Sequence, residues 1–171
     1  MKYDYIIVGA GSAGCVIANR LSEDPSTQVL LIEAGGSDRR FFIQMPIGYG
    51  VTYHQKAVNW MYMTEPSPDA DNKPSYWPRG KVMGGSSSIN AMVYVRGNSR
   101  DFDQWSEAGN PGWSYSDVLP YFKKMESWQN GPDDYRGGDG PLNVSEVSRQ
   151  LHPLCQNFLS AAQEIGIVLN K

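Results

Sequence analysis

Gly9-Ala10-Gly11-Ser12-Ala13-Gly14 follows the apolar run Tyr5-Ile6-Ile7-Val8 and matches the pattern G-x-G-x-x-G. The match is weak by itself, because small residues cluster by chance. Its surroundings strengthen it: a strand before the glycines, a helix after them, and Glu33 at the end of a second strand, nineteen residues beyond Gly14. The stretch therefore predicts a βαβ unit that binds a dinucleotide, and a glycine turn in a nucleotide-free α/β protein is the alternative.

Each position of this loop has a physical task. Gly9 makes the tight turn, Gly11 lets the backbone approach a pyrophosphate, and Gly14 lets the helix pack closely on the strand. The N–H groups from Ser12 through Ala13 to Gly14 can face the phosphates. The Glu33 carboxylate, followed by Ala34, can accept hydrogen bonds from both ribose hydroxyls and repels a 2′-phosphate, which disfavours NADP. The loop does not distinguish NAD from FAD, because both contain adenosine diphosphate.

The flanking sequence predicts the neighbouring elements. We expect a strand over residues 3–8 that is buried on both faces, a helix from about Ala13 that stops at Asp24-Pro25, and a second strand over residues 28–33. Two parallel strands cannot complete a parallel sheet, so we expect further sequence downstream. Residues 35–79 show no sustained period and predict a long loop, in which residues 66–74 have the composition of a disordered linker.

Helical patterns return in the second half of the chain. One short helix is expected over residues 101–107. A second should be capped by Ser116, with Pro120 in its first turn, and should run to about Met125. A short strand is expected over residues 142–144. A last helix, lined by Leu154, Phe158, Ala161, Ala162 and Ile165, should end at Gly166.

The composition is that of a globular protein, with 40% hydrophobic and 19% charged residues among 171. A formal charge of -3 gives no reason to expect nucleic acid or an anionic membrane as a partner. Cys15 and Cys155 lie far apart and predict reduced thiols in a cytoplasmic protein, without a disulfide framework or a metal site. The first apolar run is too short to span a bilayer and lacks the features of a signal peptide.

A second glycine-rich segment occupies residues 78–97, with the sequence PRGKVMGGSSSINAMVYVRG. Two glycines and three serines precede an apolar, helix-like run. The backbone N–H groups, the Ser86 hydroxyl and the basic side chains of Arg79 and Lys81 can all face an anion. A flexible glycine-serine connection is the alternative that composition alone favours.

The order of residues in this segment resembles the first sequence signature of the glucose-methanol-choline (GMC) oxidoreductases, in particular of choline dehydrogenase-like members. The matching residues are Gly80, Lys81, Gly84, Gly85, Ser86, Ser87, Asn90, Tyr94, Gly97 and Asp103. Residues 59–66, 109–115 and 140–142 also look like family segments. The resemblance therefore extends over essentially the whole chain.

The resemblance implies an α/β fold, with a Rossmann-like FAD-binding domain interleaved with an α+β substrate-binding domain that is incomplete in this chain. The expected division is a βαβ unit over residues 1–35, a loop or active-site lid over 36–77, a second FAD-contacting loop and helix over 78–110, and the start of the substrate domain over 111–171. The expected cofactor-binding residues are Gly9, Gly11, Ser12, Ala13, Gly14, Glu33, Ala34, Arg79, Val82, Gly85, Ser86, Asn90, Ala91, Met92 and Val93.

The resemblance also implies how the flavin is held. Residues 82–93 should lie along the pyrophosphate and the isoalloxazine ring, with Asn90 to Val93 near its reactive edge. Some relatives attach FAD through a histidine at the position of Ile89. Isoleucine cannot form that bond, so we expect non-covalent FAD.

The implied activity is oxidation of a small-molecule alcohol, with transfer of a hydride from the CH–OH group to flavin N5. Family enzymes use a histidine from their carboxy-terminal part as the base. His54 and His152 match no catalytic motif and read as surface or capping residues, so no catalytic residue is expected here. The alcohol, the electron acceptor (oxygen or another) and the oligomeric state stay open.

Two other functions stay open from sequence: a truncated, non-catalytic FAD- or nucleotide-binding fragment or subunit, and an NAD-dependent protein. Core packing is favoured over a substrate channel for the aromatic residues Trp60, Tyr62, Tyr76 and Trp77. Cys15, on the helix after the glycine loop, is expected to be a small buried packing residue.

Overall fold

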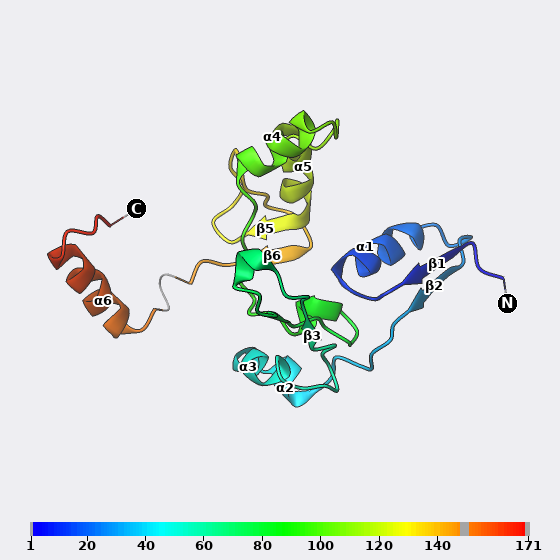
Figure 1. Ribbon diagram of the computed structural model, residues 1–171. Coiled ribbons are helices and arrows are strands. Elements are labelled where there is room, and N and C mark those ends of the chain that lie inside the picture. The colour runs from blue at the N-terminus through cyan, green and yellow to red at the C-terminus, as the bar shows by residue number, and fades with distance from the viewer. Residues whose placement is uncertain (1, 148–150, 170–171) are drawn as a thin grey trace. The chain divides into compact units, whose positions relative to one another are not determined.

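The computed structural model describes residues 2–147 and 151–169, and the chain divides into two compact units between Val93 and Tyr94. Figure 1 shows the order of the elements along the chain. We refer to residues 2–93 as the N-terminal unit and to residues 94–169 as the C-terminal unit. The assignment of their parts to a cofactor domain and a substrate domain stays a prediction.

The N-terminal unit begins with the predicted βαβ order. Strand β1 (Tyr5–Val8) pairs in parallel with β2 (Val29–Ile32), and α1 (Ser12–Leu21) connects them. Both strands are shorter than predicted. The expectation that the first strand is buried on both faces is wrong for this chain, because Ile6 is 61% and Val8 83% exposed. Among the described residues this sheet has only two strands. Both faces of a parallel sheet are normally covered by other elements, and the exposure of Ile6 and Val8 shows that this cover is incomplete here.

Helix α1 begins one residue earlier than predicted and ends ahead of the Asp24-Pro25 stop. Its N-cap is Gly11 and its last turn carries Arg20, a cation at the end where the helix dipole favours one. After the helix, the Asp24 carboxylate accepts hydrogen bonds from the backbone N–H and the hydroxyl of Ser26. The Ser26 hydroxyl, and then its backbone N–H, lower the pKa of Asp24 from its ordinary value.

Residues 35–79 contain short elements instead of the single long loop that their lack of period suggested. Three single-turn helices come first: α2 (Phe41–Gln44), η1 (Pro46–Gly48) and α3 (Tyr49–Thr52). Strands β3 (Tyr62–Met63) and β4 (Tyr76–Trp77) then form an antiparallel hairpin with a 3-10 turn, η2 (Pro68–Ala70), at its tip. Helices of one turn and strands of two residues are too short to produce a periodic pattern.

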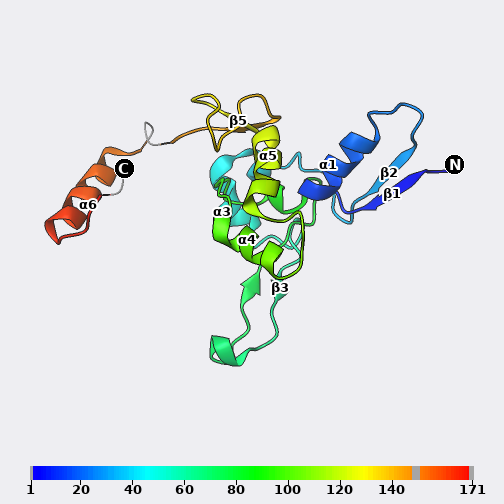
Figure 2. The same cartoon turned by 90° about the horizontal axis from the view of Figure 1, so that it is seen from above.

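We call this hairpin, residues 62–77, the hairpin arm, and Figure 2 shows it standing out from the rest of its unit. The disordered-linker interpretation of residues 66–74 is not supported. Backbone hydrogen bonds close the arm, from Thr64 N–H to the Ser75 carbonyl (2.9 Å) and from Asn72 N–H to the Ser67 carbonyl (2.9 Å).

The core of the N-terminal unit lies under the second glycine segment. Val58, Val82 and Ile89 are buried together, with Ile43 packed against them. The glycine-serine stretch itself forms a 3-10 helix, η3 (Gly85–Ser88). No helix follows over residues 89–98, so the helix-like interpretation of the apolar run was wrong. Met92 has a φ of 58°, outside the helical region, and β-branched valines follow it.

The C-terminal unit opens with two capped helices. In α4 (Ser99–Glu107) and α5 (Tyr115–Met125), the caps are Asn98 and Ser114, and each forms a capping box with an aspartate. The prediction that Ser116 caps α5 is wrong, because Ser114 caps it and pairs with Asp117, three residues further on. Pro120 therefore lies inside the helix and not in its first turn.

Two parallel three-residue strands and a last helix complete the chain. Strand β5 (Glu126–Trp128) pairs with β6 (Leu142–Val144), which confirms the strand expected there. Helix α6 (Pro153–Glu164) ends, as predicted, before Gly166, which has a φ of 87°. Its apolar side chain Phe158 and the adjoining Ile165 are 75% and 78% exposed. No helix in the described part of the chain is both long and apolar enough to cross a membrane.

Candidate cofactor site

The first glycine loop is held closely by β2 and by the first turn of α1. Gly9 has a φ of 98°, which only glycine adopts readily, and its N–H donates to the Ile32 carbonyl of β2 (2.7 Å). A methyl group at Gly14 would lie 1.9 Å from the carbonyl oxygen of Gly9. One at Gly11 would meet no atom within 4 Å. Gly14 is therefore required for packing, whereas Gly11 presents open backbone, as the sequence predicted.

Glu33 supports the loop from the end of β2. Its Oε2 accepts a hydrogen bond from Ala10 N–H (2.8 Å) and its Oε1 accepts one from Gly35 N–H (2.8 Å). Its side chain is half-buried, and Ala34 beside it is exposed. Each carboxylate oxygen can accept more than one hydrogen bond, so Glu33 keeps capacity for a ligand hydroxyl. The predicted contact with a ribose stays a prediction.

The structure brings the second glycine segment directly onto the first. Gly84 N–H donates to the Ala10 carbonyl (2.7 Å), and Met83 N–H donates to the Gly36 carbonyl (2.9 Å). At Gly85, which has a φ of 58°, a methyl group would lie 2.8 Å from the Cα of Gly11. Two segments more than seventy residues apart thus meet backbone to backbone, which the sequence alone did not show.

Two glycines outside the predicted cofactor-binding set permit this contact. A methyl group at Gly35 would lie 2.0 Å from the Lys81 carbonyl oxygen, and one at Gly80 would lie 2.1 Å from the Gly85 carbonyl oxygen. The sequence feature that could have indicated the role of Gly35 is the glycine pair, Gly35-Gly36, that follows Ala34. Glycine is needed at both positions because the neighbours are backbone atoms that cannot easily move.

The start of α1 fits an anionic group. Gly11 has no side chain to cap the helix, so the N–H groups of Ser12, Ala13 and Gly14 lack a partner in α1 and in any side chain there. The first turn also contains no acidic residue. Exposed donors at the positive end of a helix, beside backbone that no side chain shields, are what a pyrophosphate requires.

The other predicted residues lie in different environments. Val82 is fully buried in the core, and the Ser86 hydroxyl accepts a hydrogen bond from Gly80 N–H (3.1 Å). The Asn90 side chain accepts one from Met92 N–H (2.9 Å). Ala91 is half-buried, whereas Met92 and Val93 are 58% and 75% exposed.

The basic residues of this segment lie over aromatic rings. The Arg79 guanidinium is 5.4 Å from the Trp77 ring centre, and the Lys81 ammonium is 4.6 Å from that of Trp60. These contacts place Arg79 over the hairpin arm and Lys81 over Trp60, two residues before the arm. The sequence did not predict either contact.

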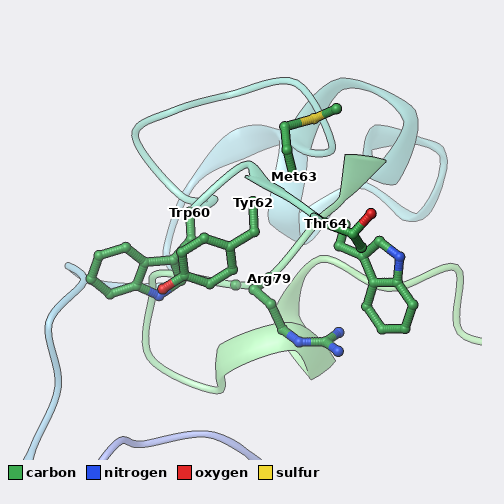
Figure 3. Close-up of a pocket in the computed structure, with 7 residues that line it drawn as sticks. Trp60, Tyr62, Met63, Thr64 and Arg79 are labelled. Carbon is green, nitrogen blue, oxygen red and sulfur yellow. The ribbon is translucent and has the colours of Figure 1, made fainter. Parts of the chain in front are cut away.

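An open cavity of about 410 Å³ lies at the base of the hairpin arm (Figure 3). It is lined by Trp60, Tyr62, Met63, Thr64, Trp77, Arg79 and Gly80. The rings of Trp60 and Tyr62 stack in parallel, 5.9 Å apart, with half of each side chain exposed or nearly so. Core packing was therefore the wrong interpretation for Trp60, Tyr62 and Trp77.

A neighbouring cavity of about 320 Å³ connects the aromatic residues to the second glycine segment. It is lined by Tyr53, Tyr76, Trp77, Pro78, Arg79, Ser86, Ile89 and Asn90. Ser86 and Asn90 are predicted cofactor residues, so this cavity borders the segment expected to lie along a flavin. Ile89 contributes little surface, because only 3% of it is exposed.

Neither histidine lies in a catalytic arrangement. The exposed His54 ring stacks on Tyr76, with ring centres 5.9 Å apart. His152 caps α6, where its Nδ1 accepts a hydrogen bond from Leu154 N–H (3.2 Å). Both cysteines are free, and the Cys15 thiol donates to the Ala10 carbonyl (3.3 Å). Within residues 2–147 and 151–169, no cluster of three or more His, Cys, Asp or Glu side chains could hold a metal ion.

Comparison with known proteins agrees with this geometry. The family described as GMC oxidoreductase matches residues 3–171, nearly the whole chain. The chain belongs to the GMC oxidoreductase family. Membership implies a flavin, and the residues at the start of α1 fit its phosphates.

The curated relatives of this GMC oxidoreductase include an oxygen-dependent choline dehydrogenase of Vibrio vulnificus, 53% identical over 165 residues. The mitochondrial choline dehydrogenase of Mus musculus is 49% identical over 172 residues. In each case 96% of this chain is matched, but only 30% and 29% of the relative. The chain thus spans about a third of the length of these relatives.

Solved structures give the same family. Pyridoxine 4-oxidase from Mesorbium loti is 36% identical and superposes with a TM-score of 0.85, over 98% of this chain and 33% of the other. A formate oxidase is 32% identical with a TM-score of 0.79, over 99% of this chain and 31% of the other. The predicted α/β fold and family are confirmed.

Proposed function

We propose that this chain binds FAD without a covalent bond, as part of an enzyme that oxidises a small-molecule alcohol. The observation that carries the proposal is the junction of the two glycine segments, where Gly84 N–H lies 2.7 Å from the Ala10 carbonyl beside the uncapped start of α1. Bound FAD would supply the acceptor for the hydride that leaves the alcohol carbon.

The residues of the chain bind and orient this cofactor. The N–H groups of Ser12 to Gly14 hold the pyrophosphate, and Glu33 accepts from the ribose hydroxyls while it keeps its two loop contacts. Residues 82–93 follow the flavin, with Asn90 to Val93 near its reactive edge. The exposure of Met92 and Val93 leaves their surfaces available for that contact.

Non-covalent attachment is supported by the position of Ile89. Its aliphatic side chain has no nucleophilic atom, and it is buried against Val58 and Val82. Acid precipitation of the flavin-loaded protein should therefore leave the flavin in the supernatant. Yellow colour retained in a washed, denatured pellet would contradict non-covalent binding.

The substrate proposal is a small alcohol, with choline the first candidate because both curated relatives named above are choline dehydrogenases. We propose that the catalytic base lies outside this chain, since His54 and His152 are engaged in a ring stack and a helix cap. The cytoplasmic location suggested by two free cysteines stays a prediction of the sequence.

Cofactor binding is tested by Gly11→Ala in the complete polypeptide. The added methyl group meets no protein atom within 4 Å, and Gly11 has a φ of -77°, which alanine adopts without strain. We expect a change in the free energy of unfolding below ~1 kcal/mol. FAD affinity, measured by the quenching of flavin fluorescence, should nevertheless fall by roughly tenfold or more, because the methyl group projects toward the pyrophosphate.

Gly50→Ala is the matched control. Gly50 lies in α3, is exposed, and likewise has no atom within 4 Å of an added methyl group. It should bind FAD as the unchanged protein does. Unaltered FAD affinity in Gly11→Ala would overturn the proposed placement of the pyrophosphate.

A further inference from the structure

Asn59 is a buried amide with every hydrogen-bonding position in use. It is 1% exposed. Its Nδ2 donates to the Tyr53 carbonyl (2.8 Å) and to the Tyr76 hydroxyl (3.1 Å). Its Oδ1 accepts from Met61 N–H (2.9 Å) and Arg79 N–H (2.9 Å). One side chain thus connects the end of α3, the residue directly before the hairpin arm, Tyr76 at the end of the arm, and Arg79 in the second glycine segment.

The backbone around Asn59 strengthens this connection. Trp60 N–H donates to the Arg79 carbonyl, and Lys81 N–H donates to the Val58 carbonyl, both at 2.8 Å. Met61, directly after these contacts, has a φ of 56°, a conformation that costs a non-glycine residue free energy. The hydrogen bond from Met61 N–H to Asn59 therefore holds a strained turn at the wall of the aromatic cavity.

The contacts continue from Arg79 into the glycine junction. Gly80 N–H donates to the Ser86 hydroxyl (3.1 Å), and Gly80 packs against the Gly85 carbonyl too closely for any side chain. Gly85 in turn packs against Gly11, and Gly84 binds Ala10. A displacement of Arg79 and Gly80 would therefore be transmitted to both glycine segments.

We propose that Asn59 is a positioning residue that couples the aromatic cavity at the base of the hairpin arm to the cofactor-binding glycine junction. The effect on bound FAD rests on the proposed function, whereas the coupling itself is a property of the protein without cofactor. Asn59 touches neither reacting atoms nor cofactor in this role; it fixes the backbone that carries Arg79 and Ser86.

The first test is hydrogen exchange of the complete polypeptide without FAD, comparing Asn59→Asp with the unchanged protein. Aspartate has the same shape as asparagine and keeps an oxygen that accepts from the N–H groups of Met61 and Arg79. It lacks the NH2 group that donates to the Tyr53 carbonyl and the Tyr76 hydroxyl. We expect amide exchange to accelerate by roughly tenfold in residues 79–88 as well as in residues 59–62. Acceleration confined to residues 59–62 would overturn the coupling.

Two further variants serve as a second test and as a control. Tyr76→Phe removes only the hydroxyl that donates to the Tyr53 carbonyl and accepts from Asn59, so it should give a smaller effect in the same residues. It carries the test if Asn59→Asp does not fold. Asn72→Asp makes the same chemical change at an exposed residue of the hairpin arm and should leave exchange in residues 79–88 unchanged.

The second test is the visible circular dichroism of bound flavin, with FAD affinity measured alongside. Asn59→Asp should weaken FAD binding by about tenfold and alter the flavin dichroism, with Asn72→Asp as the unaffected control. An unchanged flavin spectrum and affinity, in a variant whose exchange does accelerate in residues 79–88, would show that the coupling does not reach bound FAD and would overturn the cofactor part of the proposal. Failure of the unchanged protein to bind FAD would instead overturn the proposed function, and the exchange test would still decide the coupling.

Discussion

Single glycines in this chain have separable roles, and Gly14 is the one with no room to change. A methyl group there would lie 1.9 Å from the Gly9 carbonyl oxygen and 3.4 Å from an Ile7 side-chain carbon. Both the strand and the helix would have to move to relieve the first contact. Close packing therefore depends on Gly14, whereas the proposed approach of the cofactor depends on Gly11.

We expect Gly14→Ala to lower the free energy of unfolding by ~1–3 kcal/mol, the usual range for overpacking. It should also lose FAD binding, because the loop moves. Urea denaturation of the cofactor-free protein measures the first effect. Gly11→Ala, which has space for the methyl group, is the reference. Equal stabilities for the two variants would contradict the close packing of α1 on β1.

The Asp133 carboxylate should make the stability of its loop depend on pH. Its Oδ1 accepts hydrogen bonds from Tyr135 N–H and Arg136 N–H, both at 2.7 Å. The Tyr135 bond, followed by the Arg136 bond, lowers the pKa of Asp133 below its ordinary 3.8. A carboxylate with a lowered pKa stabilises the folded loop above its unfolded pKa, and this contribution is lost as pH falls through the lower, folded pKa.

Amide protection of Tyr135 and Arg136 should therefore be constant from neutral pH down to about pH 4 and should fall below it, after correction for intrinsic exchange. Asp133→Asn keeps an acceptor that does not titrate, so its protection should show no such step. A step of the same size in Asp133→Asn would show that another group controls the loop.

At the scale of elements, a buried ion cluster holds β5 to the loop that follows it. Glu126 is fully buried, and its Oε1 accepts from Arg136 (2.7 Å). Its Oε2 accepts from Arg96 and from Gly137 N–H (3.1 Å). Arg96 and Arg136 also lie over the rings of Phe122 and Trp128, which reduces their contact with water.

Replacing one partner of a buried ion pair leaves the other charges uncompensated. We expect Glu126→Gln to lower the free energy of unfolding of this unit by about 3–5 kcal/mol, measured from its denaturant midpoint. Glu107→Gln, on the exposed surface of α4, is the control and should stay within about 0.5 kcal/mol. A loss below ~1 kcal/mol for Glu126→Gln would mean that the arginines find other partners.

How far the sequence predicts these elements depends on how local their determinants are. The βαβ order, the strand over residues 142–144 and the helix end at Gly166 follow from short-range patterns and are confirmed. The Ser114 cap was missed, although its partner Asp117 stands three residues on. The hairpin arm could not be foreseen, because its two-residue strands depend on Asn59 and on main-chain bonds across about twenty residues.

The candidate site shows the same limit. Each glycine segment is recognisable alone, but the contact between Gly84 and Ala10 is tertiary and leaves no pattern in either segment. The contact of the Lys81 ammonium with the Trp60 ring is also tertiary, and charge alone does not predict it. Family resemblance supplied what local pattern could not, namely the expectation that both segments bind one cofactor.

At the scale of the whole molecule, the proposed function assigns cofactor binding to this chain and places the catalytic base outside it. We therefore expect His54→Gln and His152→Gln, made in the complete polypeptide, to leave kcat for alcohol oxidation within about threefold. His54→Gln loses a ring stack at the surface, and His152→Gln loses a helix cap worth about 1 kcal/mol of stability.

Steady-state kinetics over a range of pH distinguish a structural role from a catalytic one. A base removed by mutation lowers kcat by orders of magnitude and eliminates its limb of the pH–rate profile, whereas a lost cap or stack lowers the denaturation midpoint and keeps the profile. A fall in kcat of a hundredfold in either variant, with an unchanged denaturation midpoint, would place the base within these residues. The proposal that the catalytic base lies outside this chain would then be wrong.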